Sequence, residues 1–172
     1  SVTGGQKVVV TGFNGIGKST LLKTLTGSQN PLDGVFAFSQ QVTIGYFGQD
    51  FSWETDTLTP VQIVSNAYPK LTLKKIRQHL TRCGVLSRQA VQPMGTLSGG
   101  EQAKVKLCLL TLSPCNFLIL DEPTNHLDIQ AKDSLQAALK SFPGTILLVS
   151  HEESFYRSWA NRIIHIGDYS SP

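Results

Sequence analysis

A glycine-rich segment near the start of the chain has the spacing of a phosphate-binding loop. Gly12 and Gly17 enclose four residues, and Lys18 and Ser19 follow directly. Glycines at these positions let backbone N–H groups turn inward around a phosphate, and the following helix adds its positive end. The lysine can neutralise terminal phosphate oxygens, and the serine hydroxyl can bind Mg²⁺. This spacing therefore predicts a site for the phosphates of a nucleotide.

Two neighbouring carboxylates follow an apolar segment later in the chain. Residues 117–120 read Phe-Leu-Ile-Leu, and Asp121 and Glu122 come directly after them. Such a run predicts a buried strand, and open α/β sheets bind ligands at the carboxyl ends of their strands. In phosphoryl transfer one carboxylate holds Mg²⁺ and another orients or deprotonates the attacking water. We assign the first role to Asp121 and the second to Glu122.

A third group places two glycines at the start of a predicted helix. Ser98 can cap a helix that reaches about Leu112, and Gly99 and Gly100 occupy its first turn. Glycines there lower helix propensity but leave backbone N–H groups accessible to an anion. Since the first loop already encloses the phosphates of one nucleotide, this second anion site predicts a nucleotide held by another subunit.

The segments between these groups predict the elements that position them. Short apolar runs predict strands at 7–11, 35–38, 42–47, 117–120, 145–149 and 162–166. Helices are expected at 18–26, 98–112 and 152–160, with a further helix capped by Asp128. This alternation predicts an α/β domain with a mostly parallel sheet flanked by helices.

One segment departs from the alternation. From Pro60 to about Arg88 the apolar residues follow helical spacing, which predicts a helical lobe inserted into the fold. We place this helical subdomain at about 50–112, within a single domain that spans 1–172. A length of 172 residues with 40% hydrophobic residues suffices for one domain with its own core.

The inserted lobe is basic. Residues 57–100 contain six bases and no acid, whereas the rest of the chain has nine bases and twelve acids. The six bases are Lys70, Lys74, Lys75, Arg77, Arg82 and Arg88. Such a surface could face nucleic acid or an acidic protein, or it could be a solvated helix face.

The composition speaks against a membrane-spanning or secreted protein. No stretch approaches the roughly 20 apolar residues of a membrane-spanning helix, and the N-terminus lacks the features of a signal peptide. We therefore expect a soluble, cytoplasmic protein without direct membrane insertion. Cys83, Cys108 and Cys115 have no metal-site spacing, and we expect them to be buried as small hydrophobic residues.

Five motifs in order resemble those of an ABC-type nucleotide-binding domain, a P-loop NTPase fold. The loop Gly12–Thr20 resembles the Walker A motif, Gln49 the Q-loop, Leu97–Gln102 the signature, Leu118–Glu122 Walker B, and His151 the switch histidine. The resemblance implies ATP and Mg²⁺ as cofactors. The residues expected to contact nucleotide are Gly12, Asn14, Gly15, Gly17, Lys18, Ser19, Thr20, Ser98, Gly99 and Gly100.

The same resemblance implies roles for the remaining site residues. Gln49 would touch Mg²⁺ and the attacking water, and His151 would contact the γ-phosphate. The catalytic set is then Glu122, His151, Gln49 and Lys18, and the metal set is Ser19, Gln49 and Asp121. Two ATP molecules would be sandwiched between two domains arranged head to tail. Adenine usually stacks on an aromatic residue upstream of the phosphate loop, a position that we expect to precede Ser1.

The subfamily is indicated by Asn125 and His126, which follow the Walker B motif. Transporter domains usually carry Ser-Ala here, whereas Asn-His resembles the ABC-F proteins, twin-domain ATPases that act on the ribosome, some in antibiotic resistance. Their first domain usually carries a long helical arm between Q-loop and signature, for which 50–96 is too short. The resemblance implies the second domain of a longer protein, with a second ABC domain, the ribosome and ribosomal RNA as partners, or a homodimer mate in isolation.

The function predicted from these residues is Mg²⁺-dependent hydrolysis of ATP that closes and opens a domain pair. The main alternative is the nucleotide-binding domain of a membrane transporter, which shares all of this chemistry. A further alternative is an interaction module that does not hydrolyse ATP. Chemically competent residues at Lys18, Asp121 and Glu122 speak against that reading.

Overall fold

The computed structural model describes residues 1–48, 56–125 and 127–169. The chain divides into two compact units. One, which we call the sheet unit, comprises Ser1–Gln49, Pro114–Pro123 and Ser141–Pro172. The other, the helical unit, comprises Asp50–Ser113 and Thr124–Lys140.

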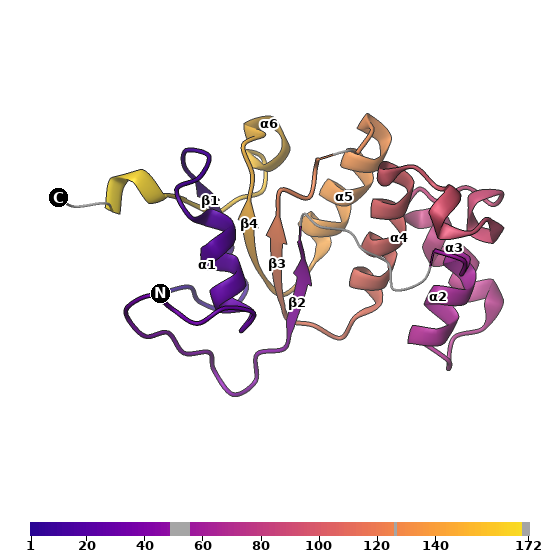
Figure 1. Ribbon diagram of the computed structural model, residues 1–172, viewed down its shortest axis with the longest axis horizontal. Helices are drawn as coiled ribbons and strands as arrows, with labels where there is room; N and C mark the ends of the chain where they lie inside the picture. The colour runs from indigo at the N-terminus through magenta and orange to yellow at the C-terminus, as the bar shows by residue number, and fades with distance from the viewer. Residues whose placement is uncertain (49–55, 126, 170–172) are drawn as a thin grey trace. The chain divides into compact units, whose positions relative to one another are not determined.

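The sheet unit is built on five parallel strands in the order β2-β3-β4-β1-β5 (Figure 1). The strands are β1 (Lys7–Thr11), β2 (Ile44–Phe47), β3 (Phe117–Asp121), β4 (Thr145–Val149) and β5 (Arg162–His165). The central strands β3 and β4 are buried along their whole length, as their continuous apolar runs require. The edge strand β5 is largely exposed. All carboxyl ends of these strands therefore lie at one edge of the sheet.

Helix α1 (Lys18–Leu25) packs on this sheet through Leu22, which joins a buried cluster with Val8, Ile119 and Leu147. Two further elements of the unit are α6 (Glu153–Tyr156) and the 3-10 turn Ile166–Tyr169. The core of the unit thus holds β1, β3 and β4 in register directly below the loops that carry the candidate residues.

The helical unit contains α2 (Pro60–Ala67), α3 (Leu73–Arg82), α4 (Gly99–Leu112), α5 (Ile129–Ser141) and two 3-10 turns, Gln89–Val91 and Met94–Thr96. Local sequence signals set the helix ends. Thr59 and Gln62 form a capping box at the start of α2. Gly84 ends α3 with a φ of 82°, and the bonds from Gly84 N to Thr81 O and from Val85 N to Leu80 O make a Schellman motif.

The predicted α/β class with a parallel sheet and flanking helices is confirmed. The predicted strand at 35–38 is wrong, because these residues form no strand and Val35 is fully exposed. A strand needs a partner, and within the described ranges none pairs with this segment. The predicted helix at 152–160 is shorter, α6 ending at Tyr156, and β2 begins at Ile44 rather than at 42.

Two compositional expectations can be compared with the structure. All three cysteines are buried thiols outside any disulfide bond, as expected for small hydrophobic residues. Among the described residues, every helix is too short or too polar to span a lipid bilayer.

Candidate nucleotide and hydrolysis site

The phosphate loop joins β1 to α1 and has backbone geometry that depends on glycine. Gly15 and Gly17 adopt φ values of 84° and 101°, in the region that favours glycine. Gly17 is the N-cap residue of α1, and no side chain caps this helix. The first N–H groups of α1 have no acceptor within the helix and can serve an anion. Asn14 and Gly15 are exposed at the loop.

Lys18 is buried at the base of this loop, with only 8% of its surface exposed. Its Nζ donates hydrogen bonds to the carbonyl oxygens of Gly12 (2.7 Å) and Phe13 (2.9 Å). Ser19 and Thr20 follow in the first turn of α1, half-buried. The loop therefore gathers a cation, backbone donors and hydroxyl groups, which together fit the phosphates of a nucleotide.

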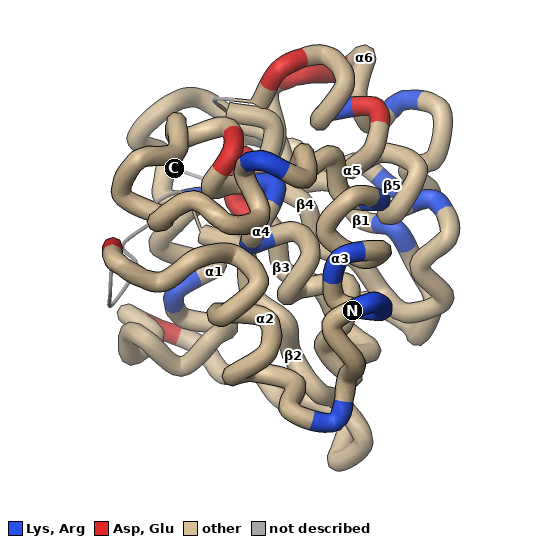
Figure 2. The backbone as a smooth tube through the Cα atoms, turned by 90° about the vertical axis from the view of Figure 1, so that its right-hand side faces the viewer, with Lys and Arg blue, Asp and Glu red and all other residues tan. Residues whose placement is uncertain are grey.

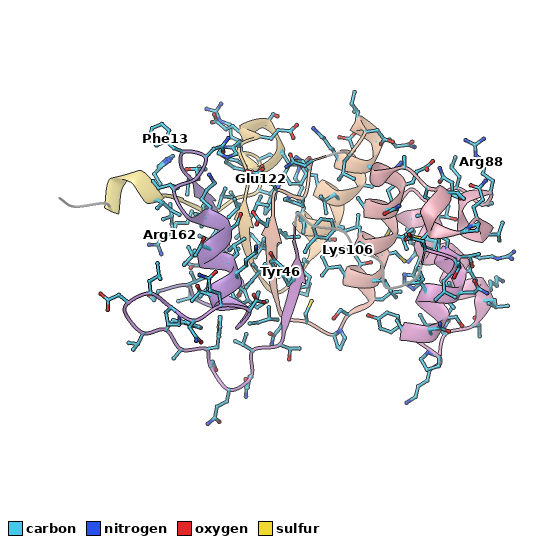
Figure 3. The ribbon with its side chains drawn as sticks, viewed as in Figure 1. Phe13, Tyr46, Arg88, Lys106, Glu122 and Arg162 are labelled. Atoms are coloured by element: carbon cyan, nitrogen blue, oxygen red, sulfur yellow. The ribbon has the colours of Figure 1, made fainter. Side chains whose placement is uncertain are left out.

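The two carboxylates lie where β3 ends, and Figure 3 labels Glu122 there. Asp121 is 2% exposed and stands opposite Val149 of β4 in the sheet register. Glu122 is 8% exposed and adopts a φ of 47°, a left-handed conformation that costs a residue with a side chain about 1–3 kcal/mol. Its backbone N–H donates to the Val149 carbonyl oxygen at 2.9 Å.

The buried carboxylate oxygens fit a divalent cation. Within the described parts of the chain, Asp121 Oδ1 has no hydrogen-bond partner despite being inaccessible to solvent. Buried polar atoms are almost always satisfied, so an orphaned carboxylate oxygen indicates a missing positive partner. The described residues contain no cluster of three metal-ligating side chains. Mg²⁺ suits this arrangement, since it is usually held by one or two carboxylates together with waters and phosphate oxygens.

His151 lies beside Glu122, just beyond the end of β4. Its Nε2 is 3.1 Å from Glu122 Oε1, close enough for an ion pair but without the alignment of a hydrogen bond. The His151 backbone N–H donates to Glu122 Oε2 at 3.4 Å. Burial raises the pKa of Glu122 above its ordinary value, while the nearby His151 acts in the opposite direction. The structure thus brings a desolvated carboxylate and a half-exposed imidazole together.

This raised pKa predicts how Glu122 affects stability. Because the folded-state pKa exceeds the unfolded one, the charged carboxylate destabilises the fold at neutral pH; this penalty decreases as pH falls through the folded-state pKa and is absent below the unfolded-state pKa. We expect Glu122→Gln to raise the midpoint of thermal unfolding at pH 7 and to leave it unchanged near pH 4. Glu153→Gln is the control, since Glu153 is exposed. An equal gain at both pH values would contradict this account.

The loop after β1, the carboxylates after β3 and His151 after β4 all belong to the sheet unit. In the sheet order, β3, β4 and β1 are consecutive neighbours and run parallel, so these three groups share one edge. Gln49, to which metal and water contacts were assigned, lies outside the described residues, and so does His126.

The Ser98 segment starts α4 in the helical unit. Ser98 and Glu101 form a capping box: Glu101 N donates to Ser98 Oγ (3.3 Å) and Ser98 N donates to Glu101 Oε2 (2.8 Å). Gln89 also donates to Glu101. Apart from its chain neighbours and the backbone of its own helix, a Cβ added at Gly99 would meet no atom of the described residues within 4 Å, so close packing does not require glycine there. This openness is consistent with close approach by a molecule outside the chain.

An ion pair beside this segment was not foreseen from the sequence. Lys104 of α4 is buried, and its Nζ lies 2.9 Å from Asp128 Oδ2. The predicted capping role of Asp128 is seen in the bond from Ala131 N to its Oδ1, at 2.7 Å. Both residues line a cavity of about 380 Å³ together with Ser98 and Gly100. The sequence feature that could have indicated this ion pair is Lys104, a charged residue among apolar positions of the predicted helix.

Comparison with known proteins supplies the family. A model of the family described as ABC transporter matches residues 1–125, which include both glycine-rich segments and the carboxylate pair. The chain belongs to this ABC family. As a member, it is an ATP-binding ABC domain.

Curated relatives place this ABC domain near the ABC-F proteins. It is 43% identical over 170 residues to an uncharacterized ABC transporter ATP-binding protein, YfmM of Bacillus subtilis, covering 93% of this chain and 33% of that protein. It is 38% identical over 153 residues to human ATP-binding cassette sub-family F member 3, covering 88% and 22%. The resemblance to ABC-F proteins is thereby confirmed. The ABC domain spans a third or less of the length of these relatives.

Solved structures agree on the fold. A dimeric ATP-binding cassette, described as a post-hydrolysis state bound to ADP and Pi, superposes with a TM-score of 0.76 at 23% identity. The match covers 94% of this chain and 81% of that one. Nearly all of the ABC domain therefore follows the fold of an ABC ATPase.

Proposed function

We propose that this ABC domain hydrolyses ATP to ADP and phosphate with Mg²⁺. The observation that supports this most is the pair of buried carboxylates next to His151 on the same sheet edge as the phosphate loop; each has a buried oxygen without a hydrogen-bond partner among the described residues. Phosphoryl transfer requires positioning and charge stabilisation more than covalent chemistry, and these residues supply both.

Each residue of the site has a separate role in the proposed hydrolysis. Lys18 and the loop N–H groups bind the phosphates, and Ser19 and Asp121 would hold Mg²⁺, which neutralises developing phosphate charge when bound. Glu122 orients the attacking water and accepts its proton, a role that its raised pKa favours. His151, half-exposed beside Glu122, would contact the γ-phosphate. Gln49 completes the proposed set through contacts to the metal and the water.

The active form in this proposal is a pair of domains arranged head to tail. The first turn of α4 leaves N–H groups without intrahelical acceptors, and Gly99 is open to an approaching ligand. These groups would bind the triphosphate held by the partner domain. Hydrolysis would then open the pair, so that the chemistry times a conformational cycle.

The protein that contains this domain would be a twin-domain ABC-F ATPase, with the present chain as its second nucleotide-binding domain. The ABC-F relatives and Asn125 support this assignment. We infer a cytoplasmic protein that acts on the ribosome in translation, with antibiotic resistance as one form of that role. A membrane transporter domain is the second candidate, because the matching family is described as ABC transporter.

ATP hydrolysis by the full-length protein, measured with and without ribosomes, tests this proposal. We expect Mg²⁺-dependent turnover that ribosomes accelerate. Hydrolysis that ribosomes leave unchanged would contradict the ribosomal role. No hydrolysis under either condition would contradict the enzymatic one. Membrane-spanning segments in the full-length sequence would favour the transporter instead.

A further inference from the structure

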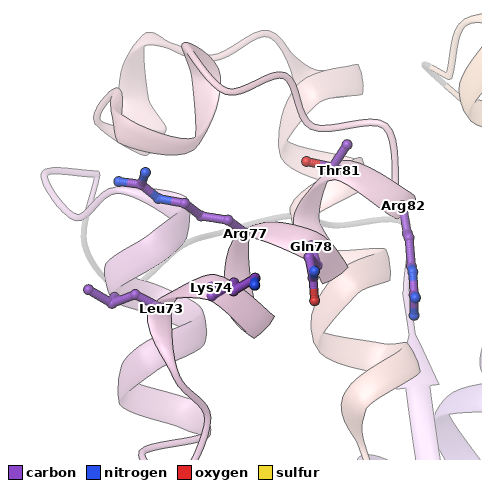
Figure 4. A pocket seen from close by; sticks show the side chains of 6 residues that line it. All are labelled: Leu73, Lys74, Arg77, Gln78, Thr81 and Arg82. Carbon is purple, nitrogen blue, oxygen red and sulfur yellow. The ribbon is translucent and has the colours of Figure 1, made fainter.

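A shallow surface pocket, largely open to solvent, lies on the exposed side of α3. Its volume is about 780 Å³. Figure 4 shows the side chains that line it. The lining residues all come from this helix: Leu73, Lys74, Arg77, Gln78, Thr81 and Arg82. We call this surface the α3 groove. It belongs wholly to the helical unit and contains none of the residues assigned to nucleotide binding or hydrolysis.

The α3 groove follows the period of the helix. Its polar members occupy positions 74, 77, 78, 81 and 82, which share one face of an α-helix. The opposite face carries Ile76 and Leu80, which are fully buried in the unit. The core therefore fixes the rotation of α3 and directs the polar row outward.

The charge of the groove is uncompensated. Lys74, Arg77 and Arg82 are exposed, and no carboxylate among the described residues forms an ion pair with them. The sequence from 57 to 100 contains no acid that could do so locally. In Figure 2, which colours bases blue and acids red, α3 carries blue segments and no red. The groove thus presents a local excess of positive charge to solvent.

The composition of the groove favours nucleic acid over an acidic protein segment. Lysine, arginine, glutamine and threonine are the side chains that contact phosphates and sugars. Their row extends about 12 Å from Lys74 to Arg82 at 1.5 Å per residue, enough to meet several phosphates of one strand. Peptides that dock in grooves usually insert apolar anchors. Leu73, at one end, is the single apolar residue of this lining.

We propose that the α3 groove binds the phosphate backbone of RNA without reading its sequence. The choice of RNA rather than DNA rests on the ribosomal role proposed above. The contact itself rests on the groove and its charge. A-form RNA is recognised mainly through its shape and backbone, because its deep, narrow major groove excludes side chains. An exposed helix face with three bases suits that mode.

The chain offers a matched control for this proposal. Lys70, Lys75 and Arg88 are also exposed bases of the same segment but do not line the groove. One variant changes Lys74, Arg77 and Arg82 to Glu, and the control changes Lys70, Lys75 and Arg88 to Glu. Both alter the net charge by the same amount, and neither removes a buried side chain.

Binding of a fluorescently labelled RNA hairpin to the chain is measured over a range of salt concentrations, without nucleotide. We expect the groove variant to lose about 10²-fold in affinity and its log–log salt slope to fall by about 2, since each phosphate contact contributes roughly 0.7–0.9. The control variant should stay within about threefold of the unchanged chain and keep most of its slope.

Three outcomes would overturn the proposal. Equal losses of RNA affinity in both variants would show that binding depends on net charge. Unchanged affinity in both would show that the α3 groove does not bind RNA. Binding of a polyglutamate peptide, but not RNA, in a groove-dependent way would assign the surface to an acidic protein. Because the assay contains no ATP, Glu122→Gln should bind RNA normally, so a failed ATPase proposal and a failed groove proposal give different results.

Discussion

Glu122→Gln lowers the rate of ATP turnover by about 10²–10⁴-fold and leaves nucleotide binding intact. The amide keeps the size of the side chain and its place beside His151 but cannot accept a proton from water. Lys18 and the glycine loop, which bind the phosphates, are unaffected. Single-turnover hydrolysis and equilibrium binding of a fluorescent ATP analogue, measured on self-paired chains, separate the two effects.

The control for this experiment is Glu153→Gln, which neutralises an exposed carboxylate on α6 that forms an ion pair with Arg157. It should hydrolyse ATP at the unchanged rate. If Glu122→Gln also turned over ATP within a few-fold of the unchanged protein, Glu122 would not activate the water. If it lost nucleotide binding together with turnover, its role would be structural.

Gly99→Asp reduces turnover by about 10²-fold or more while the chain remains folded. A Cβ at this position meets no neighbouring group of the described residues within 4 Å, and an acidic residue in the first turn of a helix is favourable to the helix. The carboxylate would, however, repel the triphosphate that a partner domain brings to this helix terminus. Turnover by the self-paired chain, together with its unfolding midpoint, measures both expectations.

Gly99→Asn separates charge from size in this experiment, because it adds nearly the same atoms without the charge. We expect it to retain much more activity than Gly99→Asp. Turnover per chain should also fall on dilution, as the pair dissociates. Full activity of Gly99→Asp, with a rate indifferent to dilution, would show that each chain completes its own site and would refute the head-to-tail pair.

Much of the fold could be predicted because buried strands appear in the sequence as continuous runs of apolar residues. The central strands β3 and β4 are covered on both faces, so residues 117–120 and 145–149 are uninterrupted apolar runs. Residues 35–38 have the same β-branched and aromatic character but no partner strand among the described residues. Strand propensity alone therefore predicts too many strands, because the pairing of strands depends on the tertiary structure.

The site was predictable where its chemistry depends on local spacing. Gly17, Lys18 and Ser19 are adjacent in the chain, and one strand–loop–helix unit orients all of them. Lys104 and Asp128 are far apart in sequence, and only the packing of α4 with the segment before α5 joins them. The left-handed turn at Glu122 also escaped prediction, because nothing local distinguishes a carboxylate held in that conformation.

The two carbonyl bonds of Lys18 have a consequence for which anions this domain retains. Any incoming ligand must compete with the oxygens of Gly12 and Phe13 for the ammonium group. When a small anion binds, the Lys18 ammonium group only replaces its two carbonyl acceptors by oxygens of that anion. A polyphosphate also engages the helix terminus and the neighbouring amides, so its additional contacts tip the exchange. We therefore expect the loop to bind simple inorganic anions weakly and polyphosphates more tightly.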